Sequence, residues 1–237
     1  MKRLVVAFGF LTRLPLPRVA ADAEDFAAAI RLYPVVGLAI GGLVAASGYV
    51  GSLLDSWIGA LAALLAWVAV TGALHLDGLG DLADGLGAAH RDRARMLAVM
   101  ADPHIGSFGV VAIVLQMLAK LILLHAVATI GWWPVMLVPF AARIGPILWA
   151  RWVPPLGDGL GAMVARAVRL RDAIGWMLVL TAAAMAVPAL VVTPFAFVAF
   201  GAWLRWRVGG VSGDCHGAGI ELVESGLLLA VIVASRL

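Results

Sequence analysis

The sequence predicts an all-α protein: a polytopic membrane helix bundle with about seven transmembrane helices and a cytoplasmic N-terminus. Three observations support this prediction. Of the 237 residues, 63% are hydrophobic and only 13% are charged, and the mean hydropathy of +1.03 exceeds that of soluble domains. Apolar runs of roughly 20 residues, the length of a membrane span, recur along the chain. Basic residues collect between alternate runs, as the positive-inside rule requires.

The N-terminal segment, residues 1–31, is the first element. Its basic start and short apolar run resemble a signal peptide, but Arg13, Pro15 and Pro17 interrupt the run. A small-residue cleavage site is also lacking. We therefore expect a retained segment that lies in the cytoplasm or at the membrane interface.

Seven apolar stretches follow and predict the spans. In order, they cover residues 34–54, 57–76, 108–130, 133–150, 173–192, 194–208 and 219–235. The stretch 173–206 is too long for one span, and the Thr193-Pro194 step is the expected turn within it. Together the spans make residues 1–237 a single integral membrane domain. One cysteine, Cys215, excludes an internal disulfide.

The basic residues orient the spans. Of the 17 Lys and Arg, all except Lys120, Arg143 and Arg236 lie in the N-terminal segment or in one alternate set of connections. This set is predicted to be cytoplasmic, together with the N-terminus. Because the basic residues are spread over several connections and form no single patch, we expect membrane lipid around the protein and no nucleic-acid partner.

The predicted cytoplasmic connection 77–107 contains an unusual group of acids. Asp77, Asp81 and Asp84 follow one another at i, i+4 and i+7, and on a helix this spacing places them within roughly 60° of one another. Their repulsion requires a compensating positive charge, and carboxylate oxygens without partnered cysteines or histidines favour Mg²⁺, Mn²⁺ or Ca²⁺ over zinc. The alternative is a solvated, acid-rich helix start, which the helix dipole favours.

Two other pairs of polar residues lie near this group or inside spans. Asp102 and His104 form either a turn with a helix cap or an extension of the metal and substrate site. Lys120 and Arg143 lie well within predicted spans, so we expect both to face the bundle interior. There they either pair with acids or bind phosphate.

Asp214, Glu221 and Glu224 form a third group, at the start of the last span. Acids beside a membrane helix are costly unless they are paired or functional. We expect them either to pair with arginines such as Arg143 or to form a second cation or substrate site.

Several segments together carry a family resemblance. They are Phe10-Leu-Thr-Arg-Leu-Pro-Leu-Pro17, Tyr33-Pro-Val-Val-Gly37, residues 75–85, residues 100–109, Arg143 and residues 213–224. In this order they resemble the cobalamin synthase family, the adenosylcobinamide-GDP ribazoletransferases or cobalamin-5′-phosphate synthases. A more distant likeness is to the CDP-alcohol phosphotransferases, whose fourth motif aspartate is replaced here by Gly106. The general base is therefore left unassigned.

The resemblance implies an Mg²⁺-dependent transferase in the bacterial inner membrane, with its active site on the cytoplasmic side. Such an enzyme joins adenosylcobinamide-GDP to α-ribazole, or to the 5′-phosphate of α-ribazole. It releases GMP and forms adenosylcobalamin or its phosphate. The oligomeric state is left open between a monomer and a homo-oligomer.

The resemblance also implies roles for the polar residues. The expected Mg²⁺ ligands on the pyrophosphate are Asp77, Asp81, Asp84 and Asp102. His104 or a spare aspartate is the expected proton acceptor. The remaining expected substrate contacts are Lys120, Arg143, Asp214 and Glu221.

Two alternatives remain at this stage: a CDP-alcohol-type phosphotransferase of lipid synthesis and a divalent-cation transporter. Similarity at 100–109 and 213–224, outside the shared motif, argues against the first. The acids gather at one predicted membrane boundary, and the outer connections are short and nearly uncharged. This distribution argues against a transporter.

Overall fold

The computed structural model describes residues 1–89, 92–158 and 160–237, and their regular structure is helical. In chain order the elements are α1 (Lys2–Leu11), α2 (Ala23–Ala29), η1 (Ile30–Leu32), α3 (Tyr33–Ser52), α4 (Ser56–Thr71), α5 (Leu74–Ala88), α6 (Arg93–Met100), α7 (Ser107–Ala128), η2 (Trp133–Met136), α8 (Leu137–Ala142), α9 (Gly145–Trp152), α10 (Leu160–Ala167), α11 (Leu170–Ala186), η3 (Pro188–Val192), α12 (Thr193–Trp203), η4 (Leu204–Val208) and α13 (Gly213–Ala234). The all-α prediction is confirmed.

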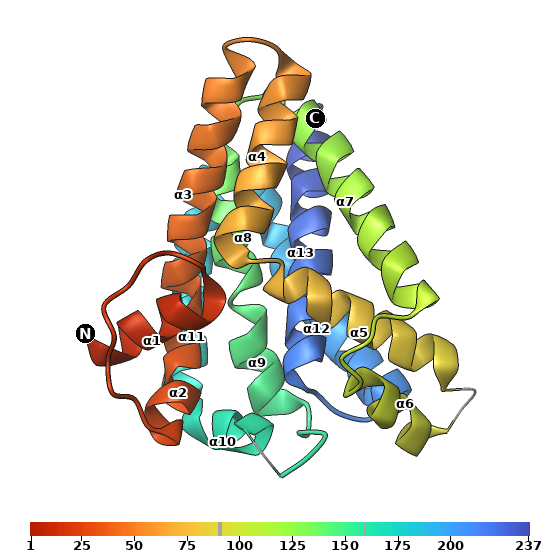
Figure 1. The fold of residues 1–237 in the computed structure, drawn as a ribbon. Helices are drawn as coiled ribbons and strands as arrows, with labels where there is room; N and C mark the ends of the chain where they lie inside the picture. Colours follow the sequence, from red (N-terminus) through yellow and green to blue (C-terminus); the bar gives the residue numbers. More distant parts are fainter. Residues whose placement is uncertain (90–91, 159) are drawn as a thin grey trace.

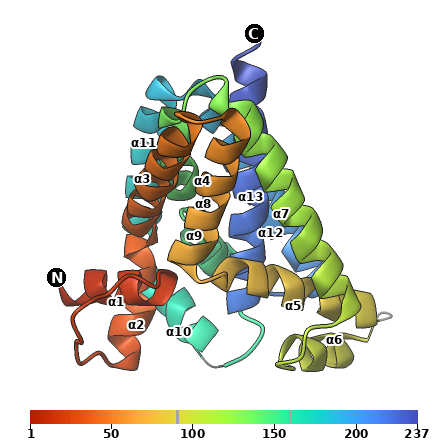
Figure 2. The ribbon, with the colours of Figure 1, turned by 45° about the horizontal axis from the view of Figure 1, so that its top comes forward.

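The long helices run lengthwise and the short helices gather towards one end. Figures 1 and 2 show α1, α2, α6 and α10 near the end of the bundle where the N-terminus lies, whereas the C-terminus lies at the opposite end. Five helical stretches are long and apolar enough to cross a membrane: Ala23–Ser52, Ser107–Ala128, Trp133–Trp152, Pro188–Val208 and Gly213–Ala234. The bent pair α4–α5 raises the number to six if it counts as one span. The structure therefore supports a multi-pass membrane bundle with five or six candidate spans. The predicted number of seven spans stays a prediction.

The region 173–208 divides at a different place from the one expected. Helix α11 has 17 residues and ends at Ala186, so it is slightly shorter than a typical span of about 20 residues. Val187 leaves the helical conformation and Pro188 begins η3. The break therefore falls at Val187-Pro188 and not at Thr193-Pro194. The residue before a proline is sterically disfavoured in the helical conformation, which explains the position of the break.

A sharp turn separates α4 from α5. Gly72 and Ala73 both have φ of +60°, and the two helix axes differ by 83°. The left-handed conformation costs Ala73 about 1–2 kcal/mol. The backbone N–H of Arg13 donates to the carbonyl of Val70 at 2.8 Å, so the N-terminal segment packs against the turn. As a result α5 runs across the bundle, and the 77–107 connection begins as a helix.

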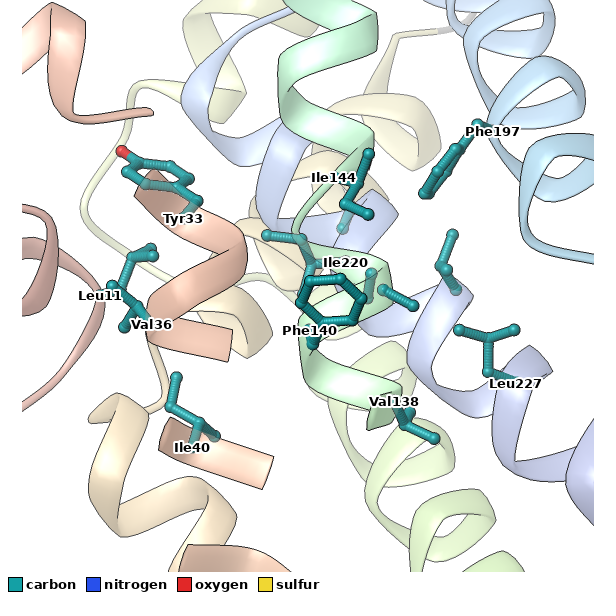
Figure 3. Close-up of a cluster of buried hydrophobic side chains, with 14 of the residues drawn as sticks. Leu11, Tyr33, Val36, Ile40, Val138, Phe140, Ile144, Phe197, Ile220 and Leu227 are labelled. Atoms are coloured by element: carbon teal, nitrogen blue, oxygen red, sulfur yellow. The ribbon is translucent and has the colours of Figure 1, made fainter. Parts of the chain in front are cut away.

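The labelled side chains of the buried core in Figure 3 come from α1, α3, α8, α12 and α13, and from Ile144 directly before α9. Phe140 and Ile144 lie between Val36 and Phe197 in that view, and all four are buried. Lipid is as apolar as these side chains, so close packing stabilises the contacts between membrane helices. Gly37 permits such an approach, because a Cβ there would lie 2.8 Å from the Cα of Phe140.

Candidate active site

The acids of α5 lie beside the start of α13 because glycines let the two helices approach closely. A Cβ on Gly78 would lie 2.8 Å from the Cα of Asp214, and one on Gly217 would lie 3.3 Å from the Cα of His75. Asp77 and Asp214 consequently line the same cavity. Asp81 is partly buried and lies within electrostatic range of both of these carboxylates. The structure thus brings together three of the predicted site residues.

Asp84 faces a different partner, the first turn of α7. Its carboxylate accepts hydrogen bonds from the backbone N–H groups of Gly106 at 2.6 Å and Gly109 at 2.9 Å. An acid at a helix N-terminus is stabilised by unpaired N–H groups and by the helix dipole. Asp84 is buried, so in this geometry it anchors α5 to α7. Its predicted role as a metal ligand stays a prediction.

Asp102 and His104 form a separate, exposed turn. The Asp102 carboxylate accepts from the backbone N–H of His104 at 2.9 Å and contacts the ring Nδ1 at 2.7 Å. These contacts hold the pKa of the Asp102 carboxyl below its usual value. The two side chains are 53% and 90% exposed, and neither lines the cavity that Asp77 and Asp214 share. The turn and cap, one of the two alternatives for this segment, is the local geometry observed.

The cavity has a volume of about 210 Å³ and a mixed lining. Its polar and charged lining residues include His75, Asp77, Asp214 and His216, from α5 and α13, and Ser212 at the start of α13. Its apolar lining residues include the aromatic side chains of Phe10, Phe26 and Tyr33, from α1, α2 and α3. Phe10 packs edge-on against Phe26 with ring centroids 4.8 Å apart, and it stacks on Tyr33 at 6.1 Å. A larger groove between α12 and α13 has an apolar lining and offers no titratable group.

Lys120 and Arg143 are paired with acids inside the bundle. Lys120 Nζ lies 2.7 Å from Glu221 Oε2 and 2.6 Å from Glu224 Oε2. Arg143 Nη1 lies 2.7 Å from Glu224 Oε1, and its Nη2 is 3.3 Å from Nδ1 of His75. Pairing is therefore the alternative that the geometry supports for both cations. Phosphate or substrate contact by Lys120, Arg143 and Glu221 stays a prediction.

Two residues that the structure makes prominent, His75 and His216, were absent from the predicted site. Glu224 belonged to the predicted third acidic group, and its pairing with Arg143, one of the two alternatives for that group, is observed. Glu224 connects both buried cations, and the two histidines line the cavity. A signal for His75 was present in the sequence, because His75 and Gly78 share the i, i+3 face of one helix. A glycine on that face indicates a close neighbour, although it does not identify the neighbour.

The donor chemistry of the cavity fits the predicted metal. Asp77, Asp81 and Asp214 offer carboxylate oxygens, which Mg²⁺ prefers. Among the described residues, no three His, Cys, Asp or Glu side chains are grouped closely enough to form a metal site by themselves. Mg²⁺ commonly takes only one or two protein carboxylates and completes its coordination with water and substrate phosphates. The acids therefore suit an ion that arrives with a phosphorylated substrate.

Several helices long and apolar enough to span a membrane, together with carboxylates at a small cavity, fit the class of membrane enzymes that act on phosphorylated substrates. Comparison with known families identifies which one. A family model described as cobalamin-5-phosphate synthase matches residues 3–232. The chain belongs to this family, as the sequence resemblance predicts, and is an enzyme of cobalamin biosynthesis.

Full-length relatives agree with the family model, and each is named adenosylcobinamide-GDP ribazoletransferase. The relative from Novosphingobium aromaticivorans is 53% identical over 238 residues, which cover 98% of this chain and 97% of the relative. That from Thiobacillus denitrificans is 45% identical and covers 100% of this chain and 97% of the relative. That from Pseudomonas aeruginosa strain PAO1 is 36% identical, with 98% of each chain covered. No solved structure matches the chain.

Proposed function

We propose that this chain is an adenosylcobinamide-GDP ribazoletransferase whose reaction takes place at the cavity between α5 and α13. A ribose hydroxyl of α-ribazole, or of its 5′-phosphate, attacks the phosphorus that carries the cobinamide group. The bond from this phosphorus to the GMP oxygen breaks, GMP leaves, and the hydroxyl proton passes to a base. The observation that supports this location of the reaction is that Asp77 and Asp214, from two different helices, line the same cavity.

Asp77 and Asp81 are the residues proposed to hold Mg²⁺. When bound, the ion would neutralise negative charge on the pyrophosphate oxygens, which is the main electrostatic requirement of phosphoryl transfer. Asp84 has both oxygens engaged with α7, and this engagement supports a positioning role for it in place of the predicted ligand role. The exposure of Asp102 and its contact with His104 support the same conclusion for that residue.

Asp214 is the proposed proton acceptor. It lines the cavity, is partly buried, and has one side-chain partner among the described residues, the hydroxyl of Ser212 at 3.3 Å. A base must lie within hydrogen-bonding reach of the proton that it takes. His104, the other predicted acceptor, is 90% exposed and lies outside the cavity lining.

The proposed topology has seven crossings, a cytoplasmic N-terminus and a cytoplasmic active site in the bacterial inner membrane. The distribution of basic residues supports this orientation. The positions of the two termini at opposite ends of the bundle (Figure 1) agree with an odd number of crossings. Helix α5, which carries the acids, lies towards the N-terminal end (Figure 2), where a soluble nucleotide substrate from the cytoplasm would reach it.

GMP release by the purified full-length protein tests this proposal. The protein is incubated with adenosylcobinamide-GDP and α-ribazole after metal removal with EDTA, and then again with added Mg²⁺. We expect no GMP without Mg²⁺, recovery when the ion is added, and a loss of at least about 100-fold in Asp81→Asn. Glu24→Gln is the matched control, since its side chain is 85% exposed. If the folded protein releases GMP at the same rate with EDTA as with Mg²⁺, and Asp81→Asn does not lower that rate, the metal assignment is refuted.

A further inference from the structure

His75 connects the buried ionic network to the cavity. Its side chain lines the cavity, yet the residue is only 3% exposed. Its Nδ1 lies 3.3 Å from Arg143 Nη2. Its side chain therefore contacts the Lys120–Glu221–Glu224–Arg143 network, and the residue also forms part of the cavity wall.

The neighbouring arginine determines the tautomer of His75. Arg143 is fully buried, and its Nη1 donates to Glu224 Oε1 at 2.7 Å and to the carbonyl of Pro139 at 3.0 Å. A guanidinium group has donors and no acceptor, so Nδ1 of His75 must accept from Nη2. A neutral histidine that accepts at Nδ1 carries its proton at Nε2. His75 thus presents an N–H donor on the far side of its ring.

This donor has no partner in the part of the chain that the structure describes. The same holds for Nδ1 of His216, which belongs to another residue of the cavity wall. Buried polar atoms are nearly always hydrogen-bonded in native proteins, so an unpaired one calls for an explanation. Two of them in the wall of one cavity indicate a ligand with polar atoms.

The size and lining of the cavity restrict that ligand. Its volume of about 210 Å³ is below the range of about 300–1,000 Å³ that drug-sized ligands occupy, so it suits one ring system and not a whole corrinoid or nucleotide. The aromatic side chains of Phe10, Phe26 and Tyr33 suit a planar, apolar group. Asp77 and Asp214, which also line the cavity, accept hydrogen bonds from hydroxyls such as those of a ribose.

We propose that this cavity binds the heteroaromatic base of the acceptor nucleoside and that the Nε2–H of His75 is a donor that fixes the nucleoside there. The proposal rests on the proposed function, because α-ribazole is the reactant that consists of a single ring system on a ribose, whereas the bases of adenosylcobinamide-GDP belong to a much larger molecule. His75 is then a specificity residue for the acceptor, and Arg143 and Glu224 are positioning residues that hold its tautomer.

Binding and kinetics of His75 variants test the proposal in the full-length protein. We expect His75→Leu to weaken binding of α-ribazole about tenfold by calorimetry without the second substrate, which corresponds to the loss of one hydrogen bond. The KM for α-ribazole should rise by a similar factor, and the KM for adenosylcobinamide-GDP should not change. His75→Gln should recover most of the affinity, because its amide N–H reaches the region of Nε2.

His125→Leu is the matched control. His125 also has a buried, unpartnered Nδ1 among the described residues, but it stacks on Trp57 with ring centroids 3.7 Å apart and lies outside the cavity lining. Gly161→Leu is a second test if His75→Leu does not fold. Gly161 lines the cavity and the atom nearest to an added Cβ is 3.9 Å away, so a leucine there should obstruct the base.

The outcomes separate the two proposals. Unchanged α-ribazole affinity in both His75→Leu and Gly161→Leu, with normal turnover, would overturn the cavity assignment and leave the transferase activity intact. Equal rises in both KM values would also overturn it, because they indicate general distortion. Binding of α-ribazole that depends on His75 in a protein without GMP release would refute the proposed function and support the cavity assignment.

Discussion

Glu224 is the most constrained charged residue of the bundle interior. It is fully buried, and its two carboxylate oxygens contact different cations, Lys120 at 2.6 Å and Arg143 at 2.7 Å. Gln116 and Glu221 complete the arrangement through a hydrogen bond of 2.9 Å between Nε2 and Oε2. Buried ion pairs contribute little net stability compared with apolar residues, but removal of one partner leaves an uncompensated charge.

Replacement of Glu224 is therefore expected to destabilise the protein strongly. Glu224→Leu should lower the free energy of unfolding by about 3–5 kcal/mol, because Lys120 and Arg143 lose a shared partner in a water-poor environment. Reversible unfolding in mixed micelles measures this change. Glu24→Gln is the control, since its exposed side chain should contribute no more than about 0.5 kcal/mol. Equal unfolding free energies for the two variants would contradict this account of the network.

At the scale of elements, the contact between α5 and α13 creates the site. The left-handed turn at Gly72 and Ala73 directs α5 across the bundle. Gly78 then allows α5 to meet the first turn of α13, where Asp214 lies. Neither helix contains the site alone: His75 and Asp77 come from α5, and Asp214 comes from α13. The distance between the two helices should therefore control activity directly.

A methyl group at this contact tests the point. Gly78→Ala places a Cβ 2.8 Å from the Cα of Asp214, and backbone atoms cannot rotate away. We expect a loss of about 1–3 kcal/mol of stability and a drop of at least about tenfold in GMP release. Gly42→Ala is the matched control on α3, because no atom lies within 4 Å of an added Cβ there. If both variants behave like the wild-type protein, the close approach is not needed for the site.

The whole molecule is polarised along the bundle. The N-terminal segment and the acids of α5 lie towards one end, and the turn between α3 and α4 and the C-terminus lie towards the other (Figures 1 and 2). Basic residues are concentrated in the predicted cytoplasmic connections. In the proposed topology, the reaction takes place at the aqueous boundary, where desolvation of the phosphate groups costs less than in the hydrocarbon core.

Cysteine labelling in sealed cells tests this orientation. In a Cys215→Ala background, Leu54→Cys should react with a membrane-impermeant maleimide from outside, since Leu54 is 80% exposed and lies at the predicted outer end. Glu24→Cys should react only after the membrane is permeabilised. The Cys215→Ala protein without an added cysteine is the control. Labelling of position 24 alone in intact cells would reverse the proposed topology.

Hydropathy and spacing predicted much of the element structure. Most span positions agree with the long helices because an apolar run of sufficient length must form helix in lipid, whatever its neighbours are. The interior positions of Lys120 and Arg143 followed in the same way. The turn at Ala73 was not predicted, and the break at Val187 was predicted at Thr193-Pro194, because both depend on local backbone conformation that hydropathy does not report.

The candidate site was predicted only in part. The i, i+4, i+7 spacing correctly grouped Asp77 and Asp81 on one helix, but it could not separate them from Asp84, which turns to α7. His75 was not predicted as a site residue, because its position in the site depends on contacts with Arg143 and with α13. Such contacts join residues that are far apart in sequence, and one sequence contains no direct record of them.

The composition of the chain alone predicted an all-α membrane protein, and its motifs indicated the family and the acidic segment, because burial in lipid and ligand chemistry act on residue type and local spacing. Only the packed structure distributed the charged residues between two roles. It paired Lys120, Arg143, Glu221 and Glu224 inside the bundle and left Asp77 and Asp214 at a cavity. The reason is geometric: a charge is compensated by whichever group lies within a few ångströms, and tertiary contacts determine which group that is.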